Sequence, residues 1–182
     1  PHVCARYWKV MFHGGYLRNF FILLMFFCFS SQASESKLMQ TAYLTSMSIS
    51  EFSQTQKSVE TICTERTDIP RVFSNLYPSI ETHLNNSIEI MEHFQAVGRE
   101  MIGEKISKVF AEHNATIANK VEKTIQPFVI LSQSRVVSAC KNWETAIMDS
   151  NSTIMKRFYE QAKFITNNKS AIFEAIDNRS NW

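Results

Sequence analysis

Apolar residues recur every three or four positions through most of the chain, which is the period of an amphipathic α-helix. The stripe from Leu38 to Cys63 predicts a first helix of about 28 residues. A second stripe, from Ile80 to Ile125, would give a helix about 70 Å long over 78–126 if it were unbroken. A third helix is expected to begin at Pro127 and reach Ile147, and a fourth carries the stripe from Met155 to Ile176.

Proline and glycine mark where these helices begin and bend. The segment Thr67–Pro70 is a break whose threonine or aspartate can cap a helix, and Pro78 fits a first helical turn. Gly98 and Gly103 lie near the middle of the second stripe, where they favour close helix packing or, less strongly, a bend. Because turn residues are so few, an all-β fold is excluded. We predict one all-α domain, an elongated bundle of four or five amphipathic helices that resembles an antiparallel coiled coil.

The N-terminal part has a different pattern. Phe20–Phe29 is a continuous apolar run, preceded by Arg18 and followed by the small-residue site Ser31–Ala33. A membrane-spanning helix needs about 20 apolar residues, so a signal peptide is favoured over a retained anchor. We therefore expect a leader over 1–33, cleaved near Ala33, and a secreted helical domain over 34–182 without stable membrane insertion. Residues 1–10 precede Met11 and receive no structural role.

Cleavage would change the charge of the chain. The whole sequence has 19 Lys and Arg and 17 Asp and Glu, a net charge of +2. Arg6, Lys9 and Arg18 lie in the leader, so 16 basic residues remain against all 17 acidic ones, a net charge of about −1. The remaining chain has no basic block that would bind a phosphate backbone, which argues against nucleic acid as a partner.

Cleavage also removes two of the four cysteines. Cys63 and Cys140 remain, and two thiols in an oxidising compartment most simply form a disulfide. Closing a loop of this length would stabilise the fold by about 4 kcal/mol in the chain-entropy model. Two free thiols or an intermolecular bridge are the alternatives.

Five N-x-S/T sequons predict N-glycosylation of a secreted chain. They are Asn85, Asn114, Asn151, Asn168 and Asn178. Asn151 lies in the segment that separates the third helix from the fourth, which makes it the best candidate. Asn85 and Asn114 fall within a predicted helix, where occupancy is expected to be lower.

No motif in the chain indicates catalysis or metal binding. His83 and His93 are ten residues apart and His113 follows twenty residues later, so the three project from different helix faces and do not form a zinc-ligand pattern. Glutamates on the long helix suit a solvated surface better than an acid/base pair. We expect neither an enzyme nor a cofactor, and an active site would require a cluster that tertiary structure alone assembles.

Methionine and aromatic residues are prominent on the apolar stripes. They fill a core by default, but they can also line a cavity for an apolar small molecule or lipid. The candidate lining residues are Met91, Phe94, Met101, Phe110, Phe128, Trp143 and Phe158. We expect a secreted, non-enzymatic helical interaction protein that works through the stretch from Pro78 to Ile125, with an apolar carrier as the alternative. Long apolar stripes on helices also favour homo-oligomers.

Overall fold

The structure is a computed structural model that describes the backbone of residues 17–180 and the side chains of 34–178. Its described part contains five α-helices and no strand, which confirms the all-α prediction. The helices are α2 (Leu17–Arg66), α3 (Val72–Ile102), α4 (Lys105–Ile130), α5 (Gln133–Met148) and α6 (Thr153–Ser180).

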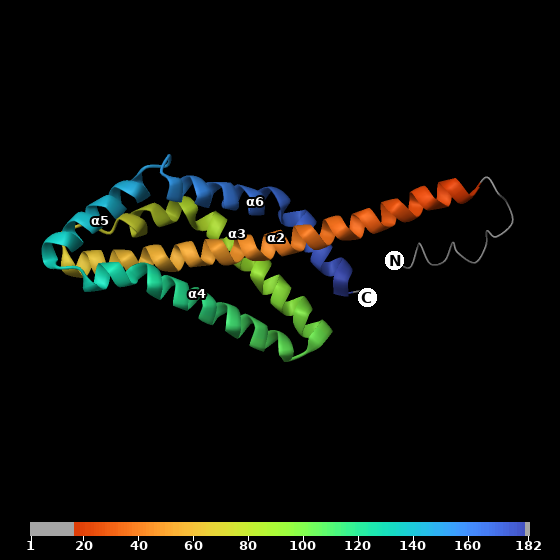
Figure 1. The fold of residues 1–182 in the computed structure, drawn as a ribbon, viewed down its shortest axis with the longest axis horizontal. Helices are drawn as coiled ribbons and strands as arrows, with labels where there is room; N and C mark the ends of the chain where they lie inside the picture. Colours follow the sequence, from red (N-terminus) through yellow and green to blue (C-terminus); the bar gives the residue numbers. More distant parts are fainter. Residues whose placement is uncertain (1–16, 181–182) are drawn as a thin grey trace.

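Helix α2 is the spine of an elongated bundle (Figure 1). It packs against each of the other four described helices. Helices α3 and α4 form an antiparallel hairpin, and α6 runs back along both α2 and α3. The short helix α5 lies where α2 and α4 end, so the bundle is covered there, whereas the α3–α4 turn projects from the bundle.

Helix α2 is longer than its apolar stripe predicts. It has 50 residues and begins at Leu17, within the segment assigned to the leader. The expected cleavage near Ala33 stays a prediction, because 1–16 lie outside the described residues and only the backbone of 17–33 is described. Within the described part, no helix is both long and apolar enough to cross a membrane.

The second stripe does not form one long helix, because the chain reverses at Gly103. This glycine has φ +61° and ψ −143°, a conformation that residues with a Cβ adopt only with strain. Its N–H donates to the carbonyl of Arg99 at 2.9 Å, which satisfies one of the last carbonyls of α3. Gly98 has the packing role, since a Cβ there would lie 2.7 Å from the side chain of Ile106 on α4. The bend that the sequence indicated as an alternative near the two glycines is therefore a full reversal of the chain at Gly103.

The prolines do not begin helices where the sequence predicts. Pro78 lies inside α3, which starts six residues earlier at Val72, and Pro127 lies inside α4. The prediction that the third helix starts at Pro127 is wrong, because α4 continues to Ile130 and α5 begins at Gln133. A proline in the last helical turn removes only one backbone hydrogen bond, so the helix can continue past it for a few residues. The fourth helix is confirmed as α6.

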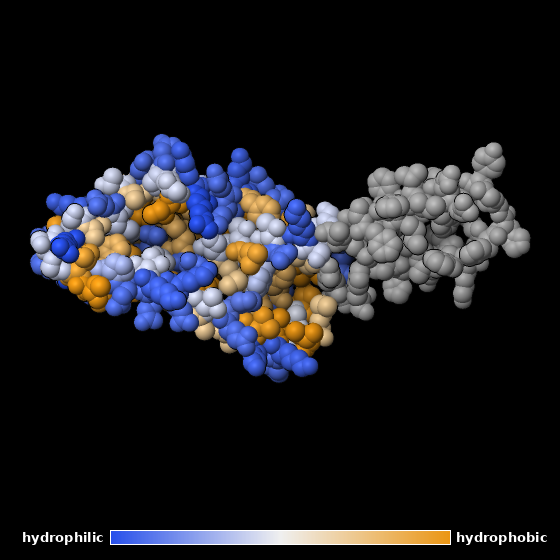
Figure 2. All heavy atoms as spheres, in the orientation of Figure 1, coloured by the Kyte–Doolittle hydropathy of each residue, from blue (hydrophilic) through white to orange (hydrophobic). Residues whose placement is uncertain are grey.

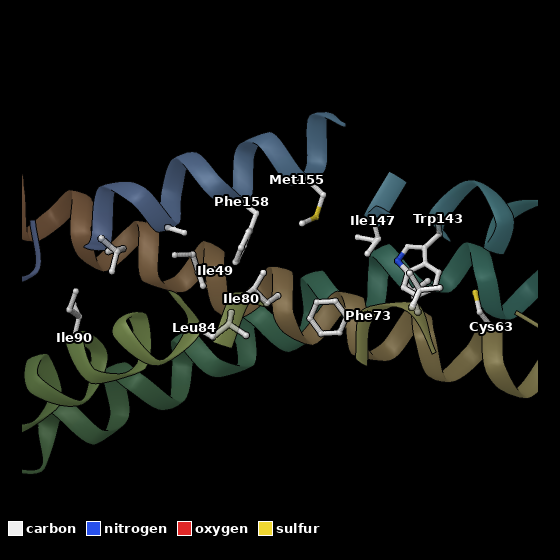
Figure 3. Packing of buried hydrophobic residues seen from close by; sticks show 14 of the residues in the cluster. Ile49, Cys63, Phe73, Ile80, Leu84, Ile90, Trp143, Ile147, Met155 and Phe158 are labelled. Atoms are coloured by element: carbon white, nitrogen blue, oxygen red, sulfur yellow. The ribbon is translucent and has the colours of Figure 1, made fainter. Parts of the chain in front are cut away.

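The core lies between α2, α3 and α6 and continues toward α5 (Figure 3). Phe158 of α6 is almost fully buried and stacks on Phe52 of α2 with ring centroids 4.5 Å apart. Phe73 at the start of α3 contacts the same Phe52 ring edge-on. The core residues therefore come from the apolar stripes that predicted the helices, although part of the second stripe stays exposed.

Candidate functional site

The two ends of the bundle are built differently, and the first is held by a disulfide. We call the region around Cys63, Arg66 and Cys140 the closed end. Cys63 near the end of α2 and Cys140 in α5 are both buried, and their Sγ atoms are bonded with Cα atoms 5.6 Å apart. The bond joins positions 77 residues apart and confirms the predicted pairing.

Arg66 closes the same end by capping α4. Its guanidinium donates to the carbonyls of Phe128 at 2.6 Å, Val129 at 2.9 Å and Leu131 at 2.8 Å. These carbonyls lie at the C-terminus of α4, where no following turn supplies donors, and a cation there also complements the helix dipole. The Gln133 side-chain amide in turn donates to the carbonyl of Arg66 at 2.6 Å.

Two buried polar residues of α2 complete the closed end. The Glu60 carboxylate accepts the backbone N–H of Ser74 at 3.0 Å, and the Ser74 hydroxyl donates to it as well. Arg71 at the N-cap of α3 makes no side-chain capping bond. Glu60 takes that role by accepting a backbone N–H of the first turn. The Gln56 side chain accepts the indole N–H of Trp143 at 2.6 Å. The sequence predicted neither contact, since each joins two different helices, across 14 residues for Glu60 and Ser74 and across 87 for Gln56 and Trp143.

The second end is the α3–α4 turn with the adjoining helical turns, residues 98–109, which we call the hairpin end. Met101 and Ile102 are 52% and 49% exposed, and Val109 is also exposed. Figure 2 shows apolar side chains gathered over this projecting tip. Removing such side chains from water lowers the free energy, so an exposed group of them is typical of an interaction surface.

An aromatic cluster supports the hairpin end from beneath. Tyr43 of α2 contacts Phe94 of α3 and Phe110 of α4 edge-on, with ring centroids 5.5 and 6.0 Å apart. The Tyr43 hydroxyl is also hydrogen-bonded to His113 of α4. One side chain of α2 therefore holds both arms of the hairpin in place.

Charged side chains of both signs surround the exposed apolar residues. Arg99, Lys105 and Lys108 are exposed next to Glu100 and Glu104. The hairpin end thus has an apolar centre with a mixed polar rim, the arrangement of many protein-binding surfaces.

The three histidines of the helical domain each join two helices. The His83 ring is hydrogen-bonded to Thr166 of α6 at 3.3 Å, and His93 pairs with Asp177 of α6 at 2.7 Å. His113 bonds Tyr43, as above. Among the described residues, no group of three or more His, Cys, Asp and Glu could hold a metal ion.

The predicted lining residues are distributed over several environments. Trp143 and Phe158 are buried in the core, and Phe94 and Phe128 are half-buried against it. Met91 and Phe110 are half-buried, whereas Met101 is exposed at the hairpin end. One open depression of about 350 Å³ lies on α4, and its lining is Asn119, Glu122, Lys123 and Gln126. All four are polar residue types, and none is among the predicted lining residues.

The predicted glycosylation sites lie on four segments of the bundle. Asn85 is in α3, Asn114 in α4, Asn151 in the α5–α6 turn, and Asn168 and Asn178 in α6. All are exposed except Asn168, which is half-buried. No family model, curated protein or solved structure matches the chain.

Proposed function

We propose that this chain is a secreted, non-enzymatic glycoprotein that binds another protein through its hairpin end. The observation that carries the proposal is the exposure of Met101 and Ile102 at the tip of a projecting helical hairpin. Because each side chain is already about half buried, covering its remaining surface with a partner would contribute about 0.8–1.5 kcal/mol. Two such residues within a charged rim provide a small central contact of the kind that dominates binding energies.

The support of the hairpin favours the same interpretation. Because Tyr43 packs on Phe94 and Phe110, the tip is presented by an ordered helical framework. A surface already fixed in its binding geometry loses less conformational entropy when a partner binds. The stretch from Pro78 to Ile125 thus provides both the buried framework and the exposed contact.

The extracellular location is proposed on three grounds. The buried disulfide is stable in oxidising compartments, the N-terminal pattern is typical of a signal peptide, and the sequons are present in excess. The non-enzymatic part of the proposal is supported by the histidines, because all three are engaged in contacts between helices.

The test uses a photoreactive amino acid at position 101 of the full chain, expressed in a secreting cell line. Proteins cross-linked in the medium are identified by mass spectrometry and purified, and their Kd for the wild-type chain is measured. The same Kd is then measured for the double variant Met101→Ser, Ile102→Ser. Loss of two buried apolar contacts should weaken binding by more than about tenfold.

The matched control is the double variant Ile130→Ser, Met148→Ser. These side chains are 71% and 68% exposed and lie near the closed end, so the control removes as much exposed apolar surface elsewhere. It should bind like the wild type. Equal Kd values for the wild type and the hairpin variant would contradict the proposal, and capture of a second copy of the chain would redefine the partner as a homo-oligomer.

A further inference from the structure

The five sequons share one sequence rule but occupy different structural environments. N-glycosylation joins the anomeric carbon of an oligosaccharide to Nδ2 of asparagine. The C–O bond to a lipid-linked diphosphate breaks, the diphosphate leaves, and Nδ2 loses one of its two protons. The product carries a large polar group that must remain in water, because burial of unpaired hydroxyls costs several kcal/mol. A native fold therefore accepts the glycan only where Nδ2 can point to solvent.

Asn151 meets this requirement within the turn between α5 and α6. Its side chain is exposed, and its backbone N–H donates to the Asp149 side chain at 2.8 Å, which fixes the turn. The following Ser152 caps α6, since its hydroxyl accepts the backbone N–H of Met155 at 3.2 Å. The polar contacts of this turn therefore hold the backbone and leave Nδ2 of Asn151 out of the packing.

Asn114 and Asn178 meet the requirement on helix surfaces. Asn114 is exposed in the middle of α4, and its sequon threonine, Thr116, is exposed too. The Thr116 hydroxyl donates only within its own helix, to the carbonyl of Glu112 at 2.8 Å. Asn178 is exposed in the last turn of α6. A glycan at either position extends away from the core.

Asn85 is an intermediate case. Its own side chain is exposed, but the sequon serine, Ser87, is buried, and its hydroxyl donates to the carbonyl of Ser46 on α2 at 3.3 Å. Because the whole sequon must be accessible for recognition, transfer to Asn85 has to precede the packing of α3 on α2. The glycan itself is compatible with the final fold.

Asn168 does not meet the requirement. It is half-buried on the face of α6 that also carries the buried Ile165 and Ile172. One helical repeat earlier on that face, the Gln161 amide donates to Ser48 of α2 at 2.9 Å, so this face packs toward α2. Nδ2 of Asn168 itself donates to the carbonyl of Phe164 at 2.8 Å. A sugar on this nitrogen would enter the seam between α6 and α2.

We infer that the fold divides the five sequons. Asn114, Asn151 and Asn178 carry N-linked glycans on the secreted domain, Asn85 does so when modified before folding, and Asn168 carries none. Transfer occurs on chains that are still folding, so the fold acts by deciding which products reach a stable native state. The inference rests on the proposed secretion of the chain and does not depend on the hairpin end binding a partner.

The experiment compares the masses of intact chains secreted by a eukaryotic cell line. Three matched variants each remove one sequon hydroxyl at an exposed position: Thr116→Ala, Thr153→Ala and Ser170→Ala. The first two should each lose the mass of one glycan, at Asn114 and Asn151. Ser170→Ala should have the glycan mass of the wild type. Treatment with a glycosidase that converts each glycosylated asparagine to aspartate then locates the sites in peptides.

Loss of one glycan mass in Ser170→Ala, or conversion of Asn168 to aspartate, would overturn the inference. So would a secreted chain without glycans at Asn114 and Asn151, an outcome that leaves the binding test of the hairpin end intact. A chain retained in the cell but glycosylated at Asn114 and Asn151 and unmodified at Asn168 would support the division of the sequons and contradict secretion.

Discussion

At the closed end of the bundle, contacts between distant segments join the helices to one another. The disulfide links α2 to α5, Arg66 caps α4, and Glu60 caps α3. At the hairpin end, one tight turn joins α3 to α4, and Met101 and Ile102 face solvent. The same amphipathic helices thus build one end that is held by a disulfide and by caps between helices, and another that is joined by a single turn. Exposed apolar side chains occur at both ends, with Ile130 and Met148 near the closed end.

This difference indicates that stability and recognition are carried by separate parts of the chain. A disulfide and charge-assisted hydrogen bonds between helices contribute to the free energy of unfolding. Exposed apolar side chains contribute little to it and remain available for a partner. Substitutions at the two ends should therefore have effects of different size and kind.

Removal of the disulfide should have the largest effect on stability. In the double variant Cys63→Ala, Cys140→Ala, the two positions, which are 77 residues apart, are no longer linked. The unfolded chain therefore gains conformational entropy. The free energy of unfolding should fall by about 4 kcal/mol. Urea denaturation followed by circular dichroism measures this change. If reduction of the wild-type disulfide leaves the urea midpoint unchanged, the closed end is not held as described.

Arg66→Met should come next. The substitution removes the donors for three carbonyl groups at the end of α4 while keeping an apolar stem. We expect a loss of about 2 kcal/mol in the free energy of unfolding, because hydrogen bonds to a charged group are the stronger ones. Arg157→Met, at an exposed position of α6, is the matched control and should stay within about 0.5 kcal/mol of the wild type. Equal losses in the two variants would argue against the capping role.

Gly98→Ala tests the packing of the hairpin arms. A Cβ at this position would lie 2.7 Å from Cδ1 and Cγ1 of Ile106, so the arms must separate at a cost of about 1.5 kcal/mol. The same substitution in an Ile106→Ala background should cost less, because the opposing atoms are gone. A double-mutant cycle of urea midpoints measures the coupling. An additive cycle would show that Gly98 does not provide close packing.

Met101→Ser together with Ile102→Ser should have the smallest effect on stability. Both side chains are about half exposed, so the free energy of unfolding should change by no more than about 0.5 kcal/mol, while partner binding weakens by more than about tenfold. Thermal and urea denaturation of the purified variant measure this. A large destabilisation would mean that the hairpin end is packed against another part of the chain, and the contrast between the two ends would not hold.

The sequence predicted the helices best where one face is apolar throughout. The pairing of Cys63 with Cys140 could also be predicted, since both lie on apolar faces and the other two cysteines fall in the segment predicted to be a leader. The helix boundary predicted at Pro127 was wrong, because the sequence alone does not distinguish a proline near the end of a helix from one at its start. For the site, the sequence predicts an interaction surface within the stretch from Pro78 to Ile125. It does not predict which residues of that stretch are exposed.

What the sequence alone determined is therefore the helical class, the buried faces and the disulfide. These follow from a period of 3.6 residues and from residue types, which are local properties. Tertiary structure decided that Gly103 reverses the chain, that Glu60 and Arg66 cap other helices, and that Asn168 is half-buried. Each of these depends on which helix lies next to which, and the periodicity of a single helix does not specify its neighbours.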